Sequence, residues 1–371
     1  MNSLCVIVPT VRNANVILQY LQNALDYKFG HNFYVILVTE DYVDKDKMKT
    51  LLKENSLDGE VFGYSERIGW FKENRCSNFI DLVPKRSHAE TSFGLLYMWA
   101  NDFKIGIFID DDTVPHPDFD FFRTHLHNLE FKGELTCLSS NKKFVNVLYK
   151  CFNKYKLYPR GYPYSARNEE YFVKKCKVSD VIVSQGLWAG VPDLDSITIL
   201  AEGRLNGIPS MILKKEDYSN NFCVEKGNLL TLCSMNLAFK REIIPAFYQL
   251  PMDDNRWGIG RFDDIWSGFF IKKIADKLDK QIINGFPLCI HNKAERNIFR
   301  DLQSEIKGIE INETLYKVVL SNEIEGSDYF ELYENLCGVL RKNLLSFGIY
   351  KKFILFMVKK MERWVELVRK L

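Results

Sequence analysis

The sequence has no excess of charge of either sign. Its 371 residues include 50 Lys and Arg against 48 Asp and Glu, which leaves a net charge of +2. A chain with so little net charge presents no broad positive field to a polyanion. We therefore expect no nucleic acid partner.

Cysteine spacing excludes two further classes of protein. The nine cysteines never occur as a C-x-x-C pair, and their number is odd. A disulfide framework and a zinc ribbon are therefore not expected, and the thiols are typical of a reducing compartment. This pattern predicts a cytoplasmic protein.

Long apolar runs and targeting signals are also lacking. The first nine residues contain neither a basic region nor an apolar stretch of the length that a signal peptide needs. The longest apolar run near the other end, residues 353–358, is far shorter than the roughly 20 residues that cross a bilayer. No repeat of fixed period and no low-complexity segment is evident.

The residues that are present predict an α/β fold. Hydrophobic residues make up 46% of the chain, and charged residues 26%, as in ordinary globular proteins. Unbroken apolar runs occur at residues 4–8, 33–39, 105–109 and 181–183, with a helix-like stretch at 14–25. Such runs are typical of strands covered by helices on both faces. We expect a mixed, mostly parallel sheet flanked by helices.

The C-terminal part has a different character. From about residue 305 the sequence is rich in Glu, Lys and Leu with helical spacing, so we expect one domain over residues 1–305 and a helical appendage over 306–371. The last helix is predicted to be amphipathic, with a basic face. Two interpretations stay open: residues 344–371 contact an anionic membrane surface peripherally, or the apolar face packs on the protein's own core or in an oligomer.

Carboxylates follow two of the predicted strands. Asp110, Asp111 and Asp112 come directly after residues 105–109, and Asp41 follows the second strand. Function in α/β sheets collects at the carboxyl ends of strands. Three adjacent carboxylates call for a hard cation such as Mg²⁺ or Mn²⁺, which Asp110 and Asp112 have the spacing to share. The alternative is a solvated acidic turn.

Three later segments carry further candidate residues. The Pro- and Gly-containing loop at 158–165 displays Arg160 and Tyr162, which suit diphosphate pairing and stacking, or form a rigid turn. Trp188 and Asp193 follow the strand at 181–183, and Asn236 lies in the segment 233–239; either segment can be purely structural.

The segment at 257–266 combines glycines, one arginine and paired carboxylates. Asp263 or Asp264 can act as a base or stabilise a cationic sugar carbon, whereas Arg261 and Asp263 can also form a structural ion pair. His291 follows a strand-like run and can complete an Asp/Asp/His metal site, although a lone histidine is more often an ordinary polar residue.

Together these segments resemble the reversibly glycosylated polypeptide family, the UDP-arabinopyranose mutases of glycosyltransferase family 75, which have a GT-A type fold. The resemblance covers about residues 4–310 and follows the order of the motifs as well as their content. The motifs that carry it are Ile7-Val-Pro-Thr-Val-Arg-Asn13, Ile109-Asp-Asp-Asp112, Arg160-Gly-Tyr-Pro-Tyr-Ser165, Gly186-Leu-Trp188 with Pro192-Asp193, Met235-Asn-Leu-Ala-Phe239, Ile259-Gly-Arg-Phe-Asp-Asp264 with Trp266, and His291-Asn-Lys-Ala294.

The resemblance implies a UDP-sugar site. Arg160 would be the arginine that becomes glycosylated, with Asp263 or Asp264 as the carboxylate that assists it. The metal, Mn²⁺ or Mg²⁺, would be held by Asp110, Asp112 and His291. The substrate-binding residues would be Pro9, Thr10, Arg12, Asp41, Asp111, Tyr162, Trp188, Asp193, Asn236 and Arg261.

Three functions remain open from the sequence. The first is a mutase that interconverts the pyranose and furanose forms of a UDP-sugar. The second is a membrane-associated glycosyltransferase with a polysaccharide or lipid-linked acceptor, and the third is a non-catalytic sugar-nucleotide-binding protein. A homo-oligomer or a complex with related subunits is compatible with each of them.

Overall fold

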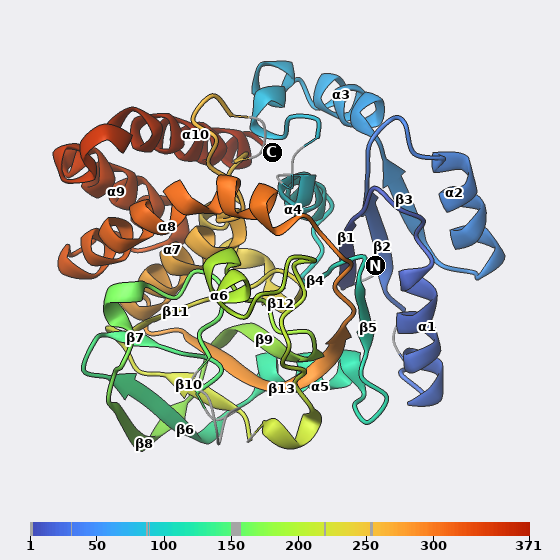
Figure 1. The fold of residues 1–371 in the computed structure, drawn as a ribbon. Helices are drawn as coiled ribbons and strands as arrows, with labels where there is room; N and C mark the ends of the chain where they lie inside the picture. Colours follow the sequence, from blue (N-terminus) through green and yellow to red (C-terminus); the bar gives the residue numbers. More distant parts are fainter. Residues whose placement is uncertain are drawn as a thin grey trace.

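The computed structural model describes residues 3–30, 32–86, 88, 90–149, 157–218, 220–252 and 255–371. Its centre is a mixed sheet with the strand order β3-β2-β1-β4-β12-β9-β13-β10-β6-β8, and β5 pairs with β13 outside this path (Figure 1). A second small sheet joins β11 to β7. The strands are β1 (Leu4–Pro9), β2 (Tyr34–Val38), β3 (Gly59–Phe62), β4 (Ile105–Ile109), β5 (Thr113–Pro115), β6 (Gly133–Ser140), β7 (Phe144–Val145), β8 (Tyr171–Val178), β9 (Val181–Gly190), β10 (Phe222–Val224), β11 (Leu229–Leu230), β12 (Asn236–Lys240) and β13 (Gln281–His291).

Helices cover both faces of this sheet. The α-helices are α1 (Val16–Asp26), α2 (Lys45–Glu54), α3 (Tyr64–Glu73), α4 (Glu90–Ala100), α5 (Phe121–Glu130), α6 (Ser196–Ala201), α7 (Asp263–Lys277), α8 (Ile298–Ser321), α9 (Tyr329–Lys342) and α10 (Lys351–Lys370). The short 3₁₀ helices are η1 (Ser77–Leu82), η2 (Tyr164–Ala166), η3 (Lys215–Asp217), η4 (Arg241–Ala246) and η5 (Leu344–Tyr350).

The four apolar runs of the sequence form four strands of the sheet: β1, β2, β4 and β9. β1 pairs in parallel with both β2 and β4, and its residues alternate between two apolar cores. Cys5 and Ile7 face the core that contains α4, whereas Val6 and Val8 face the core that contains α1 and α5. Burial on both faces explains why these strands are continuously apolar.

The second half of the sheet changes direction several times. β12 runs antiparallel to both β4 and β9, while β13 is parallel to β9. Towards the far edge, β10 is parallel to β6, and β8 is antiparallel to β6. The expected mixed α/β sheet flanked by helices is therefore confirmed, with its uninterrupted parallel part in β3-β2-β1-β4.

The C-terminal helices belong to the main core and do not form a separate appendage. The boundary expected between residues 305 and 306 falls inside α8. One apolar cluster extends from Phe108 of β4 through Trp266 of α7 to Trp364 of α10. The change in composition at this point therefore marks a change from strands to helices around a single core.

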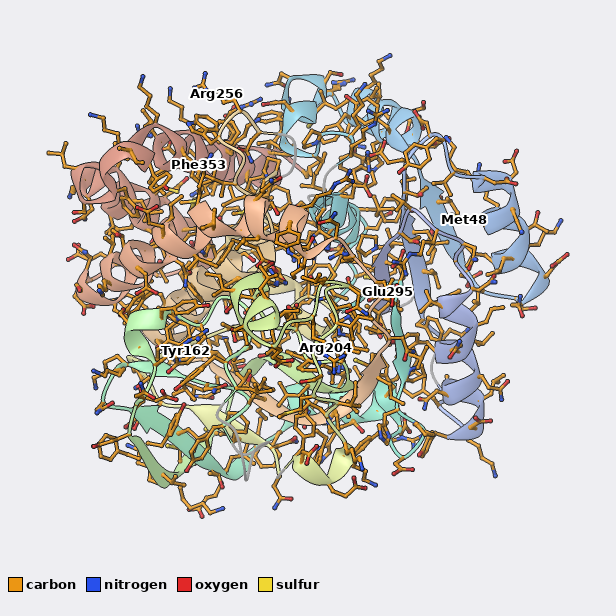
Figure 2. The ribbon with its side chains drawn as sticks, in the orientation of Figure 1. Met48, Tyr162, Arg204, Arg256, Glu295 and Phe353 are labelled. Atoms are coloured by element: carbon orange, nitrogen blue, oxygen red, sulfur yellow. The ribbon has the colours of Figure 1, made fainter. Side chains whose placement is uncertain are left out.

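The apolar face of α10 is buried against the protein. Trp364 is fully buried, donates a hydrogen bond from Nε1 to the carbonyl oxygen of Ile244 at 3.0 Å, and stacks on Tyr248. Phe353 lies on the same helix among the C-terminal elements (Figure 2). The interpretation that this face enters a membrane is thus wrong, because the core already covers it. Among the described residues, no helix combines the length and apolar character that crossing a membrane requires.

We predict that Trp364→Ala lowers the free energy of unfolding by about 3–5 kcal/mol, because it empties a fully buried aromatic site. Urea denaturation followed by circular dichroism measures the change. Lys359→Ala, on the exposed face of the same helix, is the matched control and is expected to stay within about 0.5 kcal/mol of the wild type. A loss below 1 kcal/mol for Trp364→Ala would contradict this account of α10.

Candidate functional site

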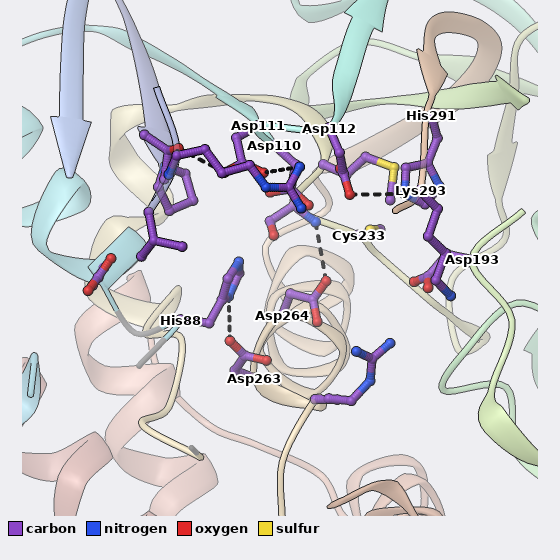
Figure 3. A pocket seen from close by; sticks show the side chains of 18 of the residues that line it. His88, Asp110, Asp111, Asp112, Asp193, Cys233, Asp263, Asp264, His291 and Lys293 are labelled. Carbon is purple, nitrogen blue, oxygen red and sulfur yellow. Dashed lines mark hydrogen bonds and ion pairs between the residues drawn. The ribbon is translucent and has the colours of Figure 1, made fainter. Parts of the chain in front are cut away.

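A polar cavity of about 620 Å³ opens at the carboxyl ends of β1 and β4 (Figure 3). Its walls come from the loops after these strands, the start of α7 and the end of β13. The lining residues are Pro9, Thr10, Val11, Arg12, Tyr42, Arg86, His88, Glu90, Asp110, Asp111, Asp112, Arg160, Asp193, Cys233, Ser234, Met235, Arg261, Asp263, Asp264, His291, Lys293 and Arg296.

The loop after β1 fixes the middle carboxylate of the Asp110–Asp112 run. The hydroxyl of Thr10 donates to Asp111 Oδ2 at 2.8 Å, and a guanidinium nitrogen of Arg12 lies 3.4 Å from Asp111 Oδ1. β1 and β4 are parallel neighbours, so their following loops meet at one edge. Asp111 is therefore held against the β1 loop.

His291 reaches the same edge through strand pairing. β5 follows Asp112 and pairs antiparallel with β13, which places Thr113 opposite His291. The Nδ1 atom of His291 lies 2.7 Å from the carbonyl oxygen of Val191, a contact that requires Nδ1 to carry the proton. Nε2 is then available as a ligand atom and lies 3.7 Å from Asp112 Oδ2.

The three adjacent carboxylates Asp110, Asp111 and Asp112 concentrate negative charge on one side of the cavity. Burial raises the pKa of Asp110 to about 7; His88 opposes this shift, and Asp112 and Asp111 add to it. Asp112 behaves differently, because His291 outweighs its burial and holds its pKa below the usual value. A cation at Asp110 would relieve the repulsion between the carboxylates.

The donor chemistry of Asp110, Asp112 and His291 fits a divalent cation, with carboxylate oxygens and one free imidazole nitrogen. Their ligand atoms do not, however, all lie within 4.8 Å of one another. Among the described His, Cys, Asp and Glu residues, the one group of three that meets this condition is a set of cysteines elsewhere in the sheet. Ligation by all three predicted residues would therefore require side-chain movement.

His88 and Asp263 form a second charged pair across the cavity. Nδ1 of His88 lies 2.6 Å from Asp263 Oδ2 at the first turn of α7 (Figure 3). Loss of solvent acts to lower the pKa of His88, but the charge and hydrogen bond of Asp263 outweigh it and raise the pKa to about 10. His88 is therefore an imidazolium at neutral pH.

Arg160 bridges two buried carboxylates. Its Nε donates to Asp193 Oδ2 at 2.9 Å, its Nη1 lies 3.4 Å from Asp264 Oδ1, and Nη1 also donates to the carbonyl oxygen of Arg261. Burial acts to lower the pKa of the guanidinium, and Asp193 and Asp264 raise it well above its usual value. Arg160 therefore carries a firmly held positive charge.

The backbone conformation of the loop that carries Arg160 requires a glycine at the next position, Gly161. Gly161 has a φ of +84°, and a Cβ atom at this position would lie 2.3 Å from the side chain of Ile265 on α7. Only glycine adopts this conformation without strain and also permits so close an approach. The loop can therefore lie directly against the start of α7.

Cationic side chains also line the cavity. Lys293 is only 8% exposed, and its Nζ has no hydrogen-bond partner among the residues that the structure describes. Burial lowers the pKa of Lys293, while Asp193 opposes this effect. Arg261 also lines the cavity, and its Nε lies 2.5 Å from Glu305 Oε1. Its ion pair is therefore with Glu305, and the structural pair with Asp263 that the sequence allowed is not formed. An unpaired buried ammonium is costly unless a ligand neutralises it.

Four predicted substrate-binding residues lie outside the cavity lining. Asp41 binds Ser65 and Lys45 on the surface, whereas Tyr42 beside it lines the cavity. Tyr162 is buried, and its hydroxyl donates a hydrogen bond to a backbone carbonyl. Trp188 is also buried, in β9. Asn236 donates to the carbonyl oxygen of Leu187, and its side-chain oxygen is hydrogen-bonded to His125. Packing and internal hydrogen bonds occupy these four side chains in this structure, and their assignment to substrate binding stays a prediction.

The remaining predicted residues do line the cavity. They are Pro9, Thr10, Arg12, Asp110, Asp111, Asp112, Arg160, Asp193, Arg261, Asp263, Asp264 and His291. The sequence reasoning missed His88, which has no motif around it. It also gave no role to Lys293, although Lys293 lies within the His291–Ala294 motif.

The fold and the cavity define an α/β protein with a charged site at the carboxyl ends of parallel strands. The family described as reversibly glycosylated polypeptide matches residues 27–371, and the chain belongs to this family. The resemblance seen in the motifs is thus confirmed.

Individual relatives are similar over most of the chain. UDP-arabinopyranose mutase 1 of Arabidopsis thaliana is 28% identical, covering 99% of this chain and 93% of the relative. Probable UDP-arabinopyranose mutase 1 of Pisum sativum is 29% identical, over 83% and 74%. Among solved structures, glucosyl-3-phosphoglycerate synthase from Mycobacterium tuberculosis in complex with Mn²⁺, UDP and glucosyl-3-phosphoglycerate is 12% identical with a TM-score of 0.41, covering 88% of this chain and 82% of that chain.

We predict that the stabilising effect of His88 depends on pH. The folded-state pKa is raised from 6.5 to about 10, so the contribution is fully present below about pH 6.5 and is lost as the pH rises towards 10. The difference in unfolding free energy between wild type and His88→Gln, measured with urea, should therefore be larger at pH 6 than at pH 10.

A double-mutant cycle provides the control for this prediction. In an Asp263→Asn background the effect of His88→Gln should become smaller and vary less with pH, because the principal partner charge is gone. A His88→Gln effect of equal size at both pH values would show that the pair has no electrostatic role.

Proposed function

We propose that the protein is a UDP-sugar mutase that interconverts pyranose and furanose ring forms. The observation that carries the proposal is the polarity of the cavity, whose lining includes both the carboxylates of Asp110 and Asp112 and the unpaired ammonium of Lys293. A sugar diphosphate with a divalent cation supplies the two charges that these walls lack. Membership of a family that includes UDP-arabinopyranose mutases supports a UDP-sugar as the substrate class.

Each wall has a distinct role in binding. Lys293, with Arg296 beside it in the lining, would take the diphosphate oxygens, which satisfies the buried ammonium. Asp110, Asp112 and His291 would hold Mn²⁺ or Mg²⁺, which would supply positive charge to stabilise a departing diphosphate. Thr10 and Arg12 engage the two carboxylate oxygens of Asp111.

The reaction needs charge stabilisation at the sugar and movement of one proton. The bond between C1 and the UDP oxygen breaks, and C1 becomes cationic. A different hydroxyl of the sugar then bonds to C1, the bond between C1 and the former ring oxygen breaks, and the bond to UDP re-forms. The hydroxyl that closes the new ring loses a proton, and the former ring oxygen gains one. Asp264 stabilises the cationic carbon, and the His88–Asp263 pair moves the proton, since it holds a proton between two groups that both line the cavity.

Self-glycosylation of Arg160 stays a prediction. The contacts of the Arg160 side chain show which group would have to remove its proton. A protonated guanidinium is not a nucleophile, and this one is held between Asp193 and Asp264. Labelling needs a base to take the proton, and the carboxylate in contact with the terminal nitrogens is Asp264. Asp263 is engaged by His88 and is less suited to this role.

Transfer to an external acceptor is the second candidate function, and a non-catalytic binding protein is the third. The apolar face of α10 is buried, so a membrane contact within residues 344–371 would have to involve η5. Leu345 and Ile349 of η5 are 85% and 83% exposed. Association with a second copy or with related subunits also stays a prediction.

The decisive experiment is chromatography of UDP-arabinopyranose after incubation with the protein and Mn²⁺, without any acceptor. A UDP-sugar isomer with a furanose ring is the expected product, and a chelator should abolish it. Lys293→Met should reduce the rate by roughly 10²- to 10³-fold, because a buried cation facing the diphosphate is removed. The control Lys317→Met, on an exposed position of α8, should retain the wild-type rate.

The other outcomes separate the alternatives. Intact substrate, or slow hydrolysis to UDP by folded protein, would contradict a mutase. Turnover that starts only when an acceptor is added would identify a transferase. Binding of the UDP-sugar without turnover under any of these conditions would leave the non-catalytic function.

The labelling prediction is tested with a UDP-sugar that carries radioactive sugar, followed by peptide mapping. Wild-type protein should carry label on the peptide with Arg160, whereas Arg160→Ala and Asp264→Asn should carry none. Arg167→Ala is the matched control, because Arg167 pairs with Asp195 and does not line the cavity. Label on the Arg160→Ala protein would refute the assignment.

A further inference from the structure

Three cysteines lie side by side on neighbouring strands at the edge of the sheet farthest from β3. Cys223 of β10 is directly paired with Cys137 of β6. On the other side of β6, Cys137 is opposite Lys174 of β8, and Cys176 lies two residues further along β8. Residues two apart on a strand share a face, so all three side chains point to the same side of the sheet.

The sulfur atoms are close enough to share one ligand. They lie within 4.8 Å of one another, and in the part of the chain that the structure describes no other group of three His, Cys, Asp or Glu residues meets this limit. All three are free thiols. None of them lines the polar cavity, so the mutase reaction gives them no role.

The three cysteines differ in their exposure to solvent. Cys137 and Cys223 are each only 3% exposed and belong to the apolar core under α5. Cys176, on the edge strand β8, is partly exposed and packs against the same core. An ion can therefore reach the sulfur atoms from the β8 side.

One basic side chain lies beside the cluster. Lys174 of β8 is directly opposite Cys137, two residues from Cys176, and it pairs with Glu225.

We propose that Cys137, Cys176 and Cys223 bind one thiophilic metal ion of the Zn²⁺ or Cu⁺ type. Soft thiolate donors select such ions, whereas Mg²⁺ and Mn²⁺ prefer oxygen donors. Three sulfur–metal bonds form, the three thiol protons leave to solvent, and no electron is transferred. A solvent molecule on the exposed Cys176 side completes the coordination where the ion requires a fourth ligand.

The bound ion joins three strands at the edge of the sheet. β10, β6 and β8 carry one ligand each, and β8 is the last strand of the order. An ion that binds only the folded state stabilises it by mass action. The site therefore has a structural role, because the ion links three strands. Its ion differs in chemical type from the cation proposed for the cavity.

The experiment uses Cd²⁺ as the probe, because cadmium thiolates absorb in the ultraviolet by sulfur-to-metal charge transfer. The full-length protein is reduced, freed of metal with a chelator and titrated. We expect the absorption to reach a plateau at one equivalent of Cd²⁺ with an accompanying rise in Tm. Excess Mg²⁺ should not displace the ion, and added Zn²⁺ should compete for the site.

Matched variants assign the ligands. Cys176→Ser changes the most accessible of the three and should abolish the one-equivalent plateau and the rise in Tm, with Cys223→Ala as a second variant. Cys337→Ala, at a buried cysteine of α9, should retain both. Circular dichroism of the apo proteins verifies folding before titration.

Three results would overturn the proposal. One is the absence of a plateau in the wild type, and another is an equal plateau in Cys176→Ser and Cys223→Ala. The third is a disulfide between two of these cysteines in freshly reduced protein, shown by alkylation and peptide mapping, because a disulfide removes two ligands.

Discussion

The guanidinium of Arg160 is the charge on which the cavity depends. It bridges Asp193, which follows β9, and Asp264, in the first turn of α7, and it also binds the carbonyl oxygen of Arg261. Removing one member of a buried ion pair leaves an uncompensated charge, at a typical cost of about 3–5 kcal/mol. Loops from three distant parts of the chain are therefore held together by one side chain.

The C-terminal helices stabilise the site from behind. Asp263 and Asp264 lie at the start of α7, and Trp266 on the same helix donates a hydrogen bond to Asn312 of α8. Asn312 in turn donates to the carbonyl oxygen of Gly161, next to Arg160. Because α10 packs into the same apolar core as α7, a helix remote from the cavity still stabilises the position of these carboxylates.

The cavity and the cysteine cluster present different ligand atoms at two separate parts of the sheet. Carboxylates at the carboxyl end of β4 suit a hard cation, whereas thiols on β10, β6 and β8 suit a soft one. The two proposals therefore assign ions of different chemical type to one chain. The proposed functions of these two sites are independent, since they share no residue.

The sequence by itself determined the sheet strands, the Asp110–Asp112 run and the family, because unbroken apolar runs and short motifs are local properties of the chain. It also located the apolar face of α10, but spacing along one helix does not reveal what covers that face. Tertiary structure alone decided that Tyr162 and Trp188 are buried and that His88 meets Asp263, a residue 175 positions away. Contacts of this kind form only when packing brings distant segments together, and no local pattern encodes them.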